Sequence, residues 1–425
     1  MENAGRETRW GAAIRAQGAG VTLAVGFIAL YFYFGLFFNN PDLYLRDNYL
    51  DADNSDWVER IAGPEGHQMD MRLPHPFAFF IFRPAGWVMN VFLATPHLSA
   101  TMLNALAGGL AVFWAWKLVK GVSGSAVYAL LMAALLGFST AHLVYGSIVE
   151  TYIFAATGLI GFYLLLQTRK DATGALVAAS LFSFGLTISN FVQTFIGFAV
   201  VRRRWKDMFR FGLLVVGIGT ALTWVHAVWY PSSRPFYLLG SSQGEEVFLF
   251  SVFSQPAWSV WGRVVLLLRT MLLYAVVAPQ PLVLLEEVSG YFPTFDFYKV
   301  SQDMYVYSEF RGLGEKLMFV WVGLIGLAGV LWLWKLIKTR QIDLSVAFVG
   351  CLLFNFALHF IYGEAPFLYS ADWAFALIFF VAYGLSPLAR NRLFQGALLV
   401  FLGFLAYNQW QFMQYMIGVM QPFVP

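Results

Sequence analysis

The 425-residue sequence is 59% hydrophobic and only 12% charged, with a formal net charge of +3, whereas about a quarter of the residues of a typical soluble protein are charged. Several apolar runs approach the roughly 20 residues that a helix needs to cross a bilayer. The composition therefore excludes a soluble globular domain and predicts a polytopic membrane protein. The single cysteine, Cys351, excludes an internal disulfide and a cysteine-based metal site.

The apolar runs predict eleven crossings. The first run, 18–38, is followed by "NNPDLYLRD" rather than by a small-residue cleavage site, which favours a retained helix over a signal peptide. Two further apolar stretches, 77–95 and 263–285, contain arginine and proline, and we interpret both as interfacial or re-entrant helices on the outer side. The expected crossings are 18–38, 99–119, 126–143, 150–167, 174–189, 190–201, 210–229, 317–337, 342–361, 366–387 and 393–414.

The basic residues support this topology, because short cytoplasmic loops carry an excess of Lys and Arg. With these crossings most basic residues lie on the inner side and most acidic residues lie on the outer side. The N-terminus is then cytoplasmic and the C-terminus is outside. We expect one all-α integral membrane domain over 1–425, with a first outer loop at about 39–98 and a long outer loop at about 230–316.

The first outer loop gathers carboxylates in "DNSDWVERIA". Asp53, Asp56 and Glu59 are spaced by three residues, so a helix would carry them on one face. Asn54 or Ser55 is the expected N-cap of this helix, which would lie at the membrane surface. The alternative is an acidic face that only keeps the loop in water.

The segment "RLPHPFAFFIFRP" follows. His75 stands between two prolines, which restrict the backbone and so the direction of the imidazole. Arg72 and Arg83 are close by, and a cation in an apolar stretch is costly unless it is paired or bound. We interpret Arg83 as a phosphate ligand, a role that suits the forked guanidinium. The alternatives are a snorkelling side chain or a structural pair with Glu59 or Asp56.

Further polar residues stand at the outer ends of later crossings. Glu150 heads a crossing, either as a helix-capping carboxylate or as a second site carboxylate opposite the first loop. Asn190, in the bend "LTISN", either satisfies broken helix ends or faces a substrate. The remaining candidates are His142, near a helix end, and Glu364, Tyr369 and Asp372 in the outer turn "YGEAPFLYSADW".

In their order and sidedness these motifs resemble a GT-C glycosyltransferase. An acidic first loop precedes the "HP" of "LPHPFAFFIF", as in protein O-mannosyltransferases and related bacterial membrane proteins, and "LNALAGGLAVFWAW" follows at the expected distance. "YGSIVETYIFA" is similar to the carboxylate-bearing second outer loop of the oligosaccharyltransferase catalytic subunit. The sequence departs from the mannosyltransferases in lacking their adjacent Asp-Glu pair and in having "HP" where they have "HPP". The likeness is clearest over the first two hundred residues.

The resemblance implies transfer of a sugar from a polyprenyl-phosphate-linked donor to a glycan, lipid or protein acceptor. The reaction would take place on the outer face of a bacterial or archaeal plasma membrane. One carboxylate suffices as the base that deprotonates the acceptor hydroxyl. We expect Asp56 to be this base, with Asp53 as its nearest rival, and Glu150 to position the acceptor. The donor phosphate would contact His75, Arg83, Arg72 and Asn190, and the substrate-facing residues would be Glu59, His142, Glu364, Tyr369 and Asp372.

A divalent metal on Asp53, Asp56 and Glu150 is optional, because no motif demands it. No nucleic-acid partner is expected. Two other classes compete with the transferase: a lipid-linked glycan transporter or flippase, and a non-catalytic membrane assembly protein. The polar residues gather at one face and not at mid-membrane, and the sequence shows no inverted repeat, which disfavours a transporter.

Overall fold

The computed structural model describes residues 2–43, 48–233, 245–285 and 292–424. The first ten helices are α1 (Glu2–Phe38), α2 (Asn54–Ala62), α3 (Ala78–Leu93), α4 (Pro96–Ser123), α5 (Ala126–Phe138), α6 (Thr140–Ser147), α7 (Tyr152–Thr168), α8 (Thr173–Leu186), α9 (Asn190–Arg202) and α10 (Trp205–Trp229). The later helices are α11 (Ala257–Arg269), which continues into a π-helical turn at Thr270–Tyr274, then α12 (Leu313–Thr339), α13 (Leu344–Ile361), α14 (Ala371–Gly384) and α15 (Arg392–Met420).

Two small hairpins interrupt the helical pattern. Strands β1 (Leu282–Leu285) and β2 (Pro293–Asp296) pair antiparallel, as do β3 (Tyr298–Ser301) and β4 (Met304–Tyr307). The protein is mostly helical with little sheet, in agreement with the expected all-α class. The strands are only four residues each, at the lower limit of the length over which alternation indicates a strand.

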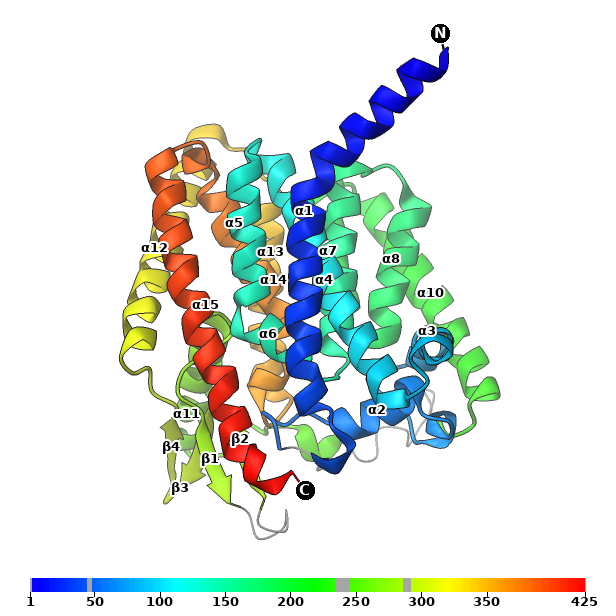
Figure 1. Ribbon diagram of the computed structural model, residues 1–425, viewed down its shortest axis with the longest axis vertical. Helices are drawn as coiled ribbons and strands as arrows, with labels where there is room; N and C mark the ends of the chain where they lie inside the picture. The colour runs from blue at the N-terminus through cyan, green and yellow to red at the C-terminus, as the bar shows by residue number, and fades with distance from the viewer. Residues whose placement is uncertain (1, 44–47, 234–244, 286–291, 425) are drawn as a thin grey trace.

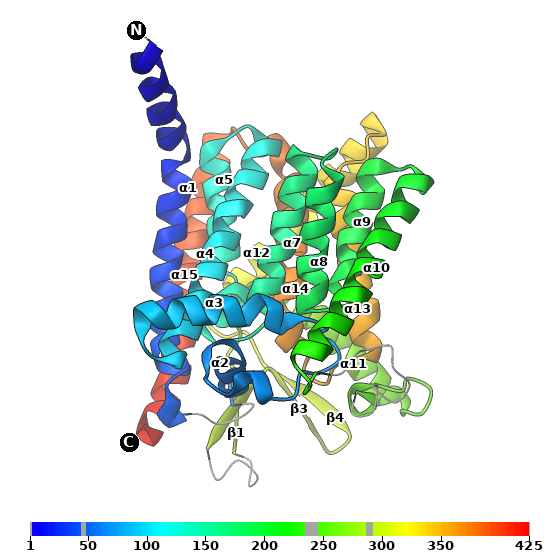
Figure 2. The same ribbon diagram turned by 90° about the vertical axis from the view of Figure 1, so that its right-hand side faces the viewer.

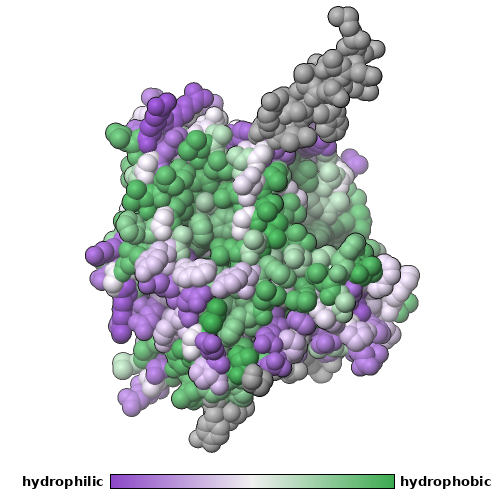
Figure 3. Space-filling model, in the orientation of Figure 1, coloured by the Kyte–Doolittle hydropathy of each residue, from purple (hydrophilic) through white to green (hydrophobic). Residues whose placement is uncertain are grey.

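The long helices run side by side as a bundle (Figure 1). One end of the bundle carries short turns. The other end, which we call the elaborated end, carries α2, α3, α11 and the two hairpins. Figure 3 shows hydrophobic side chains over the middle of the bundle and hydrophilic ones toward both ends. This distribution is the one that a bilayer requires of an integral membrane protein.

Six described helices are long and apolar enough to cross a membrane: Gln17–Phe38, Pro96–Ser123, Trp205–Trp229, Leu313–Thr339, Leu344–Ile361 and Arg392–Phe423. The pair α5 and α6, bent by 60°, would make a seventh span. These helices confirm the prediction of an integral membrane protein. Each of the eleven predicted segments coincides with a helix or with this bent pair, but several of those helices, such as α8 and α14, are shorter than 18 residues.

Helix α14 forms the centre of the bundle, because all fourteen of its residues are buried. A helix that is apolar on every side has to be enclosed by other elements, and α14 packs on α7, α12 and α13. Its first turn lies at the elaborated end, just after the 3-10 turn Pro366–Tyr369. Asp372 in that first turn is consequently buried as well.

Helix α3 lies across the direction of the bundle at the elaborated end, and α2 lies beside it (Figure 2). The two helices approach closely at Gly86, where a Cβ would stand 2.0 Å from the carbonyl oxygen of Ile61. The outer face of α3 exposes Trp87, Val91 and Phe92, each more than two-thirds accessible. Helix α3, which lies beside α2, therefore exposes an apolar face of the kind that suits a membrane surface.

Gln409 of α15 holds the break between α5 and α6 against the segment that follows α11. Its side-chain amide donates to the carbonyl oxygens of Phe138 (3.0 Å) and Val276 (2.9 Å), and its own oxygen accepts the N–H of Ala278 at 3.1 Å. The break therefore has hydrogen-bond partners inside the bundle, where unpaired backbone groups are costly.

Replacing Gln409 by leucine should lower stability, because each buried backbone group left without a partner costs about 1–3 kcal/mol. Thermal unfolding of the purified protein measures the effect. Gln411→Leu is the matched control, since Gln411 is exposed and donates to the Tyr407 hydroxyl of its own helix. Equal unfolding temperatures for the two variants would contradict the role of Gln409.

Impermeant thiol labelling tests the predicted orientation. Cys351 is buried, and in a Cys351→Ser background single cysteines can replace four exposed residues: Lys170 and Gln341 at the short-turn end, and Glu65 and Asp303 at the elaborated end. We expect labelling in intact cells at positions 65 and 303, with the other two reacting only after the membrane is opened. The reverse pattern would contradict an outward-facing elaborated end.

Candidate active site at the elaborated end

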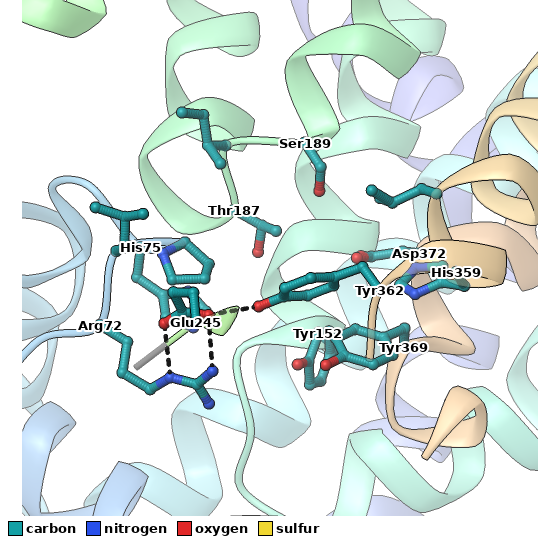
Figure 4. Close-up of a pocket in the computed structure, with 14 residues that line it drawn as sticks. Arg72, His75, Tyr152, Thr187, Ser189, Glu245, His359, Tyr362, Tyr369 and Asp372 are labelled. Carbon is teal, nitrogen blue, oxygen red and sulfur yellow. Dashed lines mark hydrogen bonds and ion pairs between the residues drawn. The ribbon is translucent and has the colours of Figure 1, made fainter. Parts of the chain in front are cut away.

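A cavity of about 250 Å³ lies at the elaborated end (Figure 4). Five segments build its wall: the loop Arg72–His75, the start of α7, the turn between α8 and α9, Glu245, and the stretch from the end of α13 to the start of α14. Segments far apart in the sequence meet here because the bundle brings their ends together. The cavity is the natural candidate for a substrate site, since it is concave and combines apolar walls with convergent polar groups.

Arg72 and Glu245 form a forked ion pair at the cavity. Arg72 donates from Nε and Nη2 to the two carboxylate oxygens of Glu245, at 3.2 and 3.0 Å, and the Tyr362 hydroxyl donates to the same carboxylate at 2.7 Å. Burial alone would lower the pKa of Arg72, but the hydrogen bonds and charge of Glu245 hold that pKa above its usual value. The guanidinium also lies over the ring of Phe248 at 4.3 Å.

Asp372 lines the opposite wall, and a chain of buried polar side chains continues behind it, outside the cavity lining. Asn190 donates to the Asp372 carboxylate at 3.2 Å and accepts from the side chain of Gln193 at 2.8 Å. Nearby, the His359 ring stacks on Tyr369 with a centroid distance of 4.4 Å. The sequence places Asn190 and Asp372 in different outer turns, and the structure brings them into contact because α9 and α14 begin at the same level.

Glu150 and Asp53 form the second charged feature. Glu150 lies in the turn between α6 and α7, where its carboxylate accepts the backbone N–H of Asp53 at 3.0 Å and that of Thr151 at 2.8 Å. Burial, together with the negative charge of Asp53, raises the pKa of Glu150 well above the usual range. Near neutral pH Glu150 therefore favours its protonated, uncharged form.

Two asparagines hold the Glu150 turn in place. Asn39 donates to the carbonyl oxygen of Ser147 at 2.8 Å and accepts the N–H of Val149 at 3.0 Å. Asn104 donates to the carbonyl oxygen of Tyr145 at 2.7 Å. Asn39 begins the stretch "NNPDLYLRD" and Asn104 stands in "LNALAGGLAVFWAW", but the sequence analysis gave neither asparagine a role.

Tyr369 connects the carboxylate pair with the cavity. Burial raises the pKa of Tyr369, and the negative charges of Asp51 and Glu150 raise it further, whereas Arg72 lowers it. Tyr369 therefore lies within electrostatic reach of the ion-pair site and of the acidic segment. Its neighbour Tyr152, at a centroid distance of 5.3 Å, also lines the cavity.

Asp56, the expected base, lies one turn further along α2. It forms an ion pair with Arg60 at 3.5 Å, and Arg60 in turn lies over the ring of Trp57 at 5.0 Å. The N-cap of α2 is Asp53, so the predicted cap at Asn54 or Ser55 is wrong. Asn54 instead donates to the carbonyl oxygen of Phe38 at 2.8 Å, because the end of α1 needs a donor there.

Among the described residues, no three His, Cys, Asp or Glu side chains are grouped closely enough to hold a metal ion. The optional set of Asp53, Asp56 and Glu150 is thus not assembled as a triad in this structure.

The predicted phosphate ligands lie in different places. Arg72 lines the cavity, whereas Arg83 donates to the carbonyl oxygen of Gly63 at 2.6 Å and so caps the C-terminal end of α2. His75 also lines the cavity, with its Nδ1 at 2.5 Å from the carbonyl oxygen of Leu186. Burial lowers the pKa of His75 to about 4, so its imidazole is neutral near pH 7 and offers a hydrogen bond to a phosphate but no charge.

The other substrate-facing candidates are dispersed. Tyr369 and Asp372 line the cavity. Glu364 is exposed, and its carbonyl oxygen accepts from Arg263 and from the Tyr298 hydroxyl. His142 is buried within α6, and Glu59 is half-buried beside Gly63 at the far end of α2. The sequence analysis gave no site role to Glu245, Tyr362, His359 or Tyr152, which the fold brings to the same cavity.

No known protein-family model matches the chain, and no curated protein matches its sequence.

Glu150 should make stability depend on pH. Its pKa is raised in the folded protein, so the folded state holds this proton more tightly than the unfolded state does, and stability falls as pH rises above the ordinary carboxyl range. We expect the unfolding temperature of the wild type to decline from about pH 5 to about pH 9, with a flatter profile for Glu150→Gln. Glu65→Gln, at an exposed position, is the control, and parallel profiles for all three proteins would refute the assignment.

Proposed function

We propose that the protein is a GT-C-type glycosyltransferase that uses a polyprenyl-phosphate-linked sugar donor on the non-cytoplasmic face of the membrane. The observation that carries this proposal is the carboxylate pair of Asp53 and Glu150, placed near a cavity that contains the Arg72 guanidinium. A transferase of this kind needs a base for the acceptor hydroxyl and a cation for the departing phosphate. Both groups lie at the elaborated end of an apolar bundle, where a lipid substrate could keep its tail in the bilayer.

In the proposed reaction Asp53 is the base. Asp56 is already engaged by Arg60, whereas Asp53 lies against the carboxylate of Glu150, which favours its protonated form. Asp53 takes the proton of the acceptor hydroxyl, and the acceptor oxygen forms a bond to the anomeric carbon. The bond between that carbon and the phosphate oxygen breaks, and the phosphate leaves with the electron pair toward Arg72. Glu150 positions the acceptor, and the chain residues account for these steps without a metal.

The proposal includes the finer topology. The eleven segments parallel to the bundle axis would all cross the membrane, with the shorter helices α7, α8, α9 and α14 enclosed by the longer ones. Helices α3 and α11 would stay on the outer side, and the N-terminus would be cytoplasmic. The excess of Lys and Arg in the short turns supports this orientation. The membrane would be a bacterial or archaeal plasma membrane.

A transporter of lipid-linked glycans is the second candidate. The observation in its favour is Asp372, a buried carboxylate at the start of α14 that accepts from the Asn190 amide of α9, because ionisable groups inside a helix bundle often mark a transport path. The transferase remains the better proposal, since the carboxylate pair, the guanidinium and the cavity gather at one end.

Asp53→Asn should abolish most sugar transfer while leaving the fold intact. The amide keeps the shape of the side chain but cannot accept the proton, so we expect a loss of about a hundredfold or more. The assay follows transfer from a panel of polyprenyl-phosphate sugars, mannose included, to extracted membrane lipids, glycans and proteins.

Asp56→Asn is the matched control, one turn along the same helix, and should retain most of the transfer activity. Loss in Asp56→Asn with full activity in Asp53→Asn would return the role of base to Asp56. Full activity in both variants and in Glu150→Gln would remove the chemical basis of the transferase proposal and favour the transporter.

A further inference from the structure

Three hydrogen-bond donors converge on the carboxylate of Glu245 in the cavity. Two come from the guanidinium of Arg72 and one comes from the hydroxyl of Tyr362. A guanidinium fork with an adjacent hydroxyl is a donor set that suits the oxygens of a phosphate as well as those of a carboxylate. The three donors therefore form an anion subsite, and in this structure a side chain of the protein itself occupies it (Figure 4).

Glu245 belongs to a short segment, residues 245–250, which we call the strap. The strap is tied to the end of α13 by two backbone hydrogen bonds, from Phe250 N–H to the carbonyl oxygen of Ile361 and from Gly363 N–H to that of Phe248, both at 2.9 Å. Its side chains Val247 and Leu249 are 67% and 55% exposed. Apart from the half-buried rings of Phe248 and Phe250, which pack on Tyr362 and Phe360, the strap has few apolar contacts, and a segment of this kind opens at low cost.

The donors of the subsite are held more firmly than the strap. The loop that carries Arg72 continues into Pro74, whose carbonyl oxygen accepts the N–H of Ile188 at 2.9 Å, and into His75, which contacts the end of α8. The next residues on the chain lead into buried Phe77 and α3. Tyr362 directly follows α13. The anion subsite thus stands on rigid elements while its occupant stands on a loosely packed one.

The contact between Arg72 and Glu245 is also only partly shielded from water. The two side chains are 38% and 16% exposed, and ion pairs of this kind are screened and individually weak. A phosphate carries more negative charge than a carboxylate and offers more acceptor oxygens. Such a ligand can therefore compete with Glu245 for the same three donors.

We infer that Glu245 is an internal ligand of the anion subsite formed by Arg72 and Tyr362, and that a phosphate-bearing ligand displaces it on binding. The identity of that ligand as a lipid phosphate rests on the proposed function. The subsite itself rests on the hydrogen bonds and on the position of the strap. Glu245 then lowers the apparent affinity of the site, because the binding-competent state is only part of the population.

Phosphate binding to the full chain in nanodiscs of zwitterionic lipid tests the inference. The two probes are farnesyl phosphate and inorganic phosphate, and the variants are Glu245→Gln and, as matched control, Glu246→Gln. Glu246 is the exposed neighbour in the same strap, so its substitution removes the same charge without touching the subsite. We expect Glu245→Gln to bind farnesyl phosphate about tenfold more tightly than the wild type, with Glu246→Gln unchanged.

The gain should disappear when Arg72→Gln is combined with Glu245→Gln, because the guanidinium is the group that Glu245 blocks. A preference for farnesyl phosphate over inorganic phosphate would identify a lipid headgroup as the ligand, and equal affinity would identify free phosphate. Binding by Glu245→Gln that is no tighter than binding by Glu246→Gln would overturn the inference and make Glu245 a structural partner of Arg72. So would a failure of every variant to bind either probe.

A second measurement uses the wild type and does not depend on the folding of a variant. Carbodiimide-driven amine labelling, read by mass spectrometry, reports how accessible the Glu245 carboxylate is, with Glu246 as internal reference. Saturating farnesyl phosphate should raise the ratio of Glu245 to Glu246 labelling severalfold, and an unchanged ratio would overturn the inference. Neither experiment measures sugar transfer, so failure here and failure of the transferase proposal are distinguished by the activity of Asp53→Asn.

Discussion

The hydrogen bond from the backbone N–H of Asp53 to the buried carboxylate of Glu150 joins the start of α2 to the helix bundle. Many features of the elaborated end depend on this contact. It fixes where α2 begins, and α2 in turn supports α3 at their close approach around Gly86. The chain between these two helices carries Arg72 and His75 into the cavity. A shift of the Glu150 turn would therefore move both the carboxylate pair and the guanidinium.

Buried polar groups need hydrogen-bond partners, and this requirement explains the arginines in the apolar stretches 77–95 and 263–285. Arg83 donates to the last carbonyls of α2, and Arg263 donates to the carbonyl oxygen of His359 at 2.6 Å and to that of Glu364 at 3.0 Å, beyond the end of α13. The last carbonyls of a helix have no partner within the helix, and water is scarce beside lipid. A guanidinium can satisfy several of them at once, and this role makes its own burial tolerable.

The apolar runs of the sequence predicted where the long helices lie, because the thickness of a bilayer sets the length of a helix that crosses it. The sequence also identified Asp53, Glu150, Arg72 and Asp372 as polar residues in an apolar setting. It could not distinguish Arg83 as a helix cap from Arg83 as a phosphate ligand, since both roles favour a cation in the same place. Glu245 stands in "GSSQGEEVF", whose first five residues lie outside the described part of the chain, and an acidic loop residue looks solvated until its partner Arg72 is known.

The charged groups at and near the cavity are arranged so that little charge is left uncompensated. Burial raises the pKa of Glu150 and so favours its uncharged form, and the two carboxyl groups then repel an incoming phosphate less than two ionised groups would. Arg72, in turn, is paired with Glu245 before a ligand arrives and with the phosphate afterwards under our inference. The exchange replaces one anion by another, so the half-buried guanidinium is never left without a counter-charge, which would be costly. Glu245 would thus stabilise the site when no ligand is bound. A phosphate would have to bind Arg72 more strongly than Glu245 does in order to replace it.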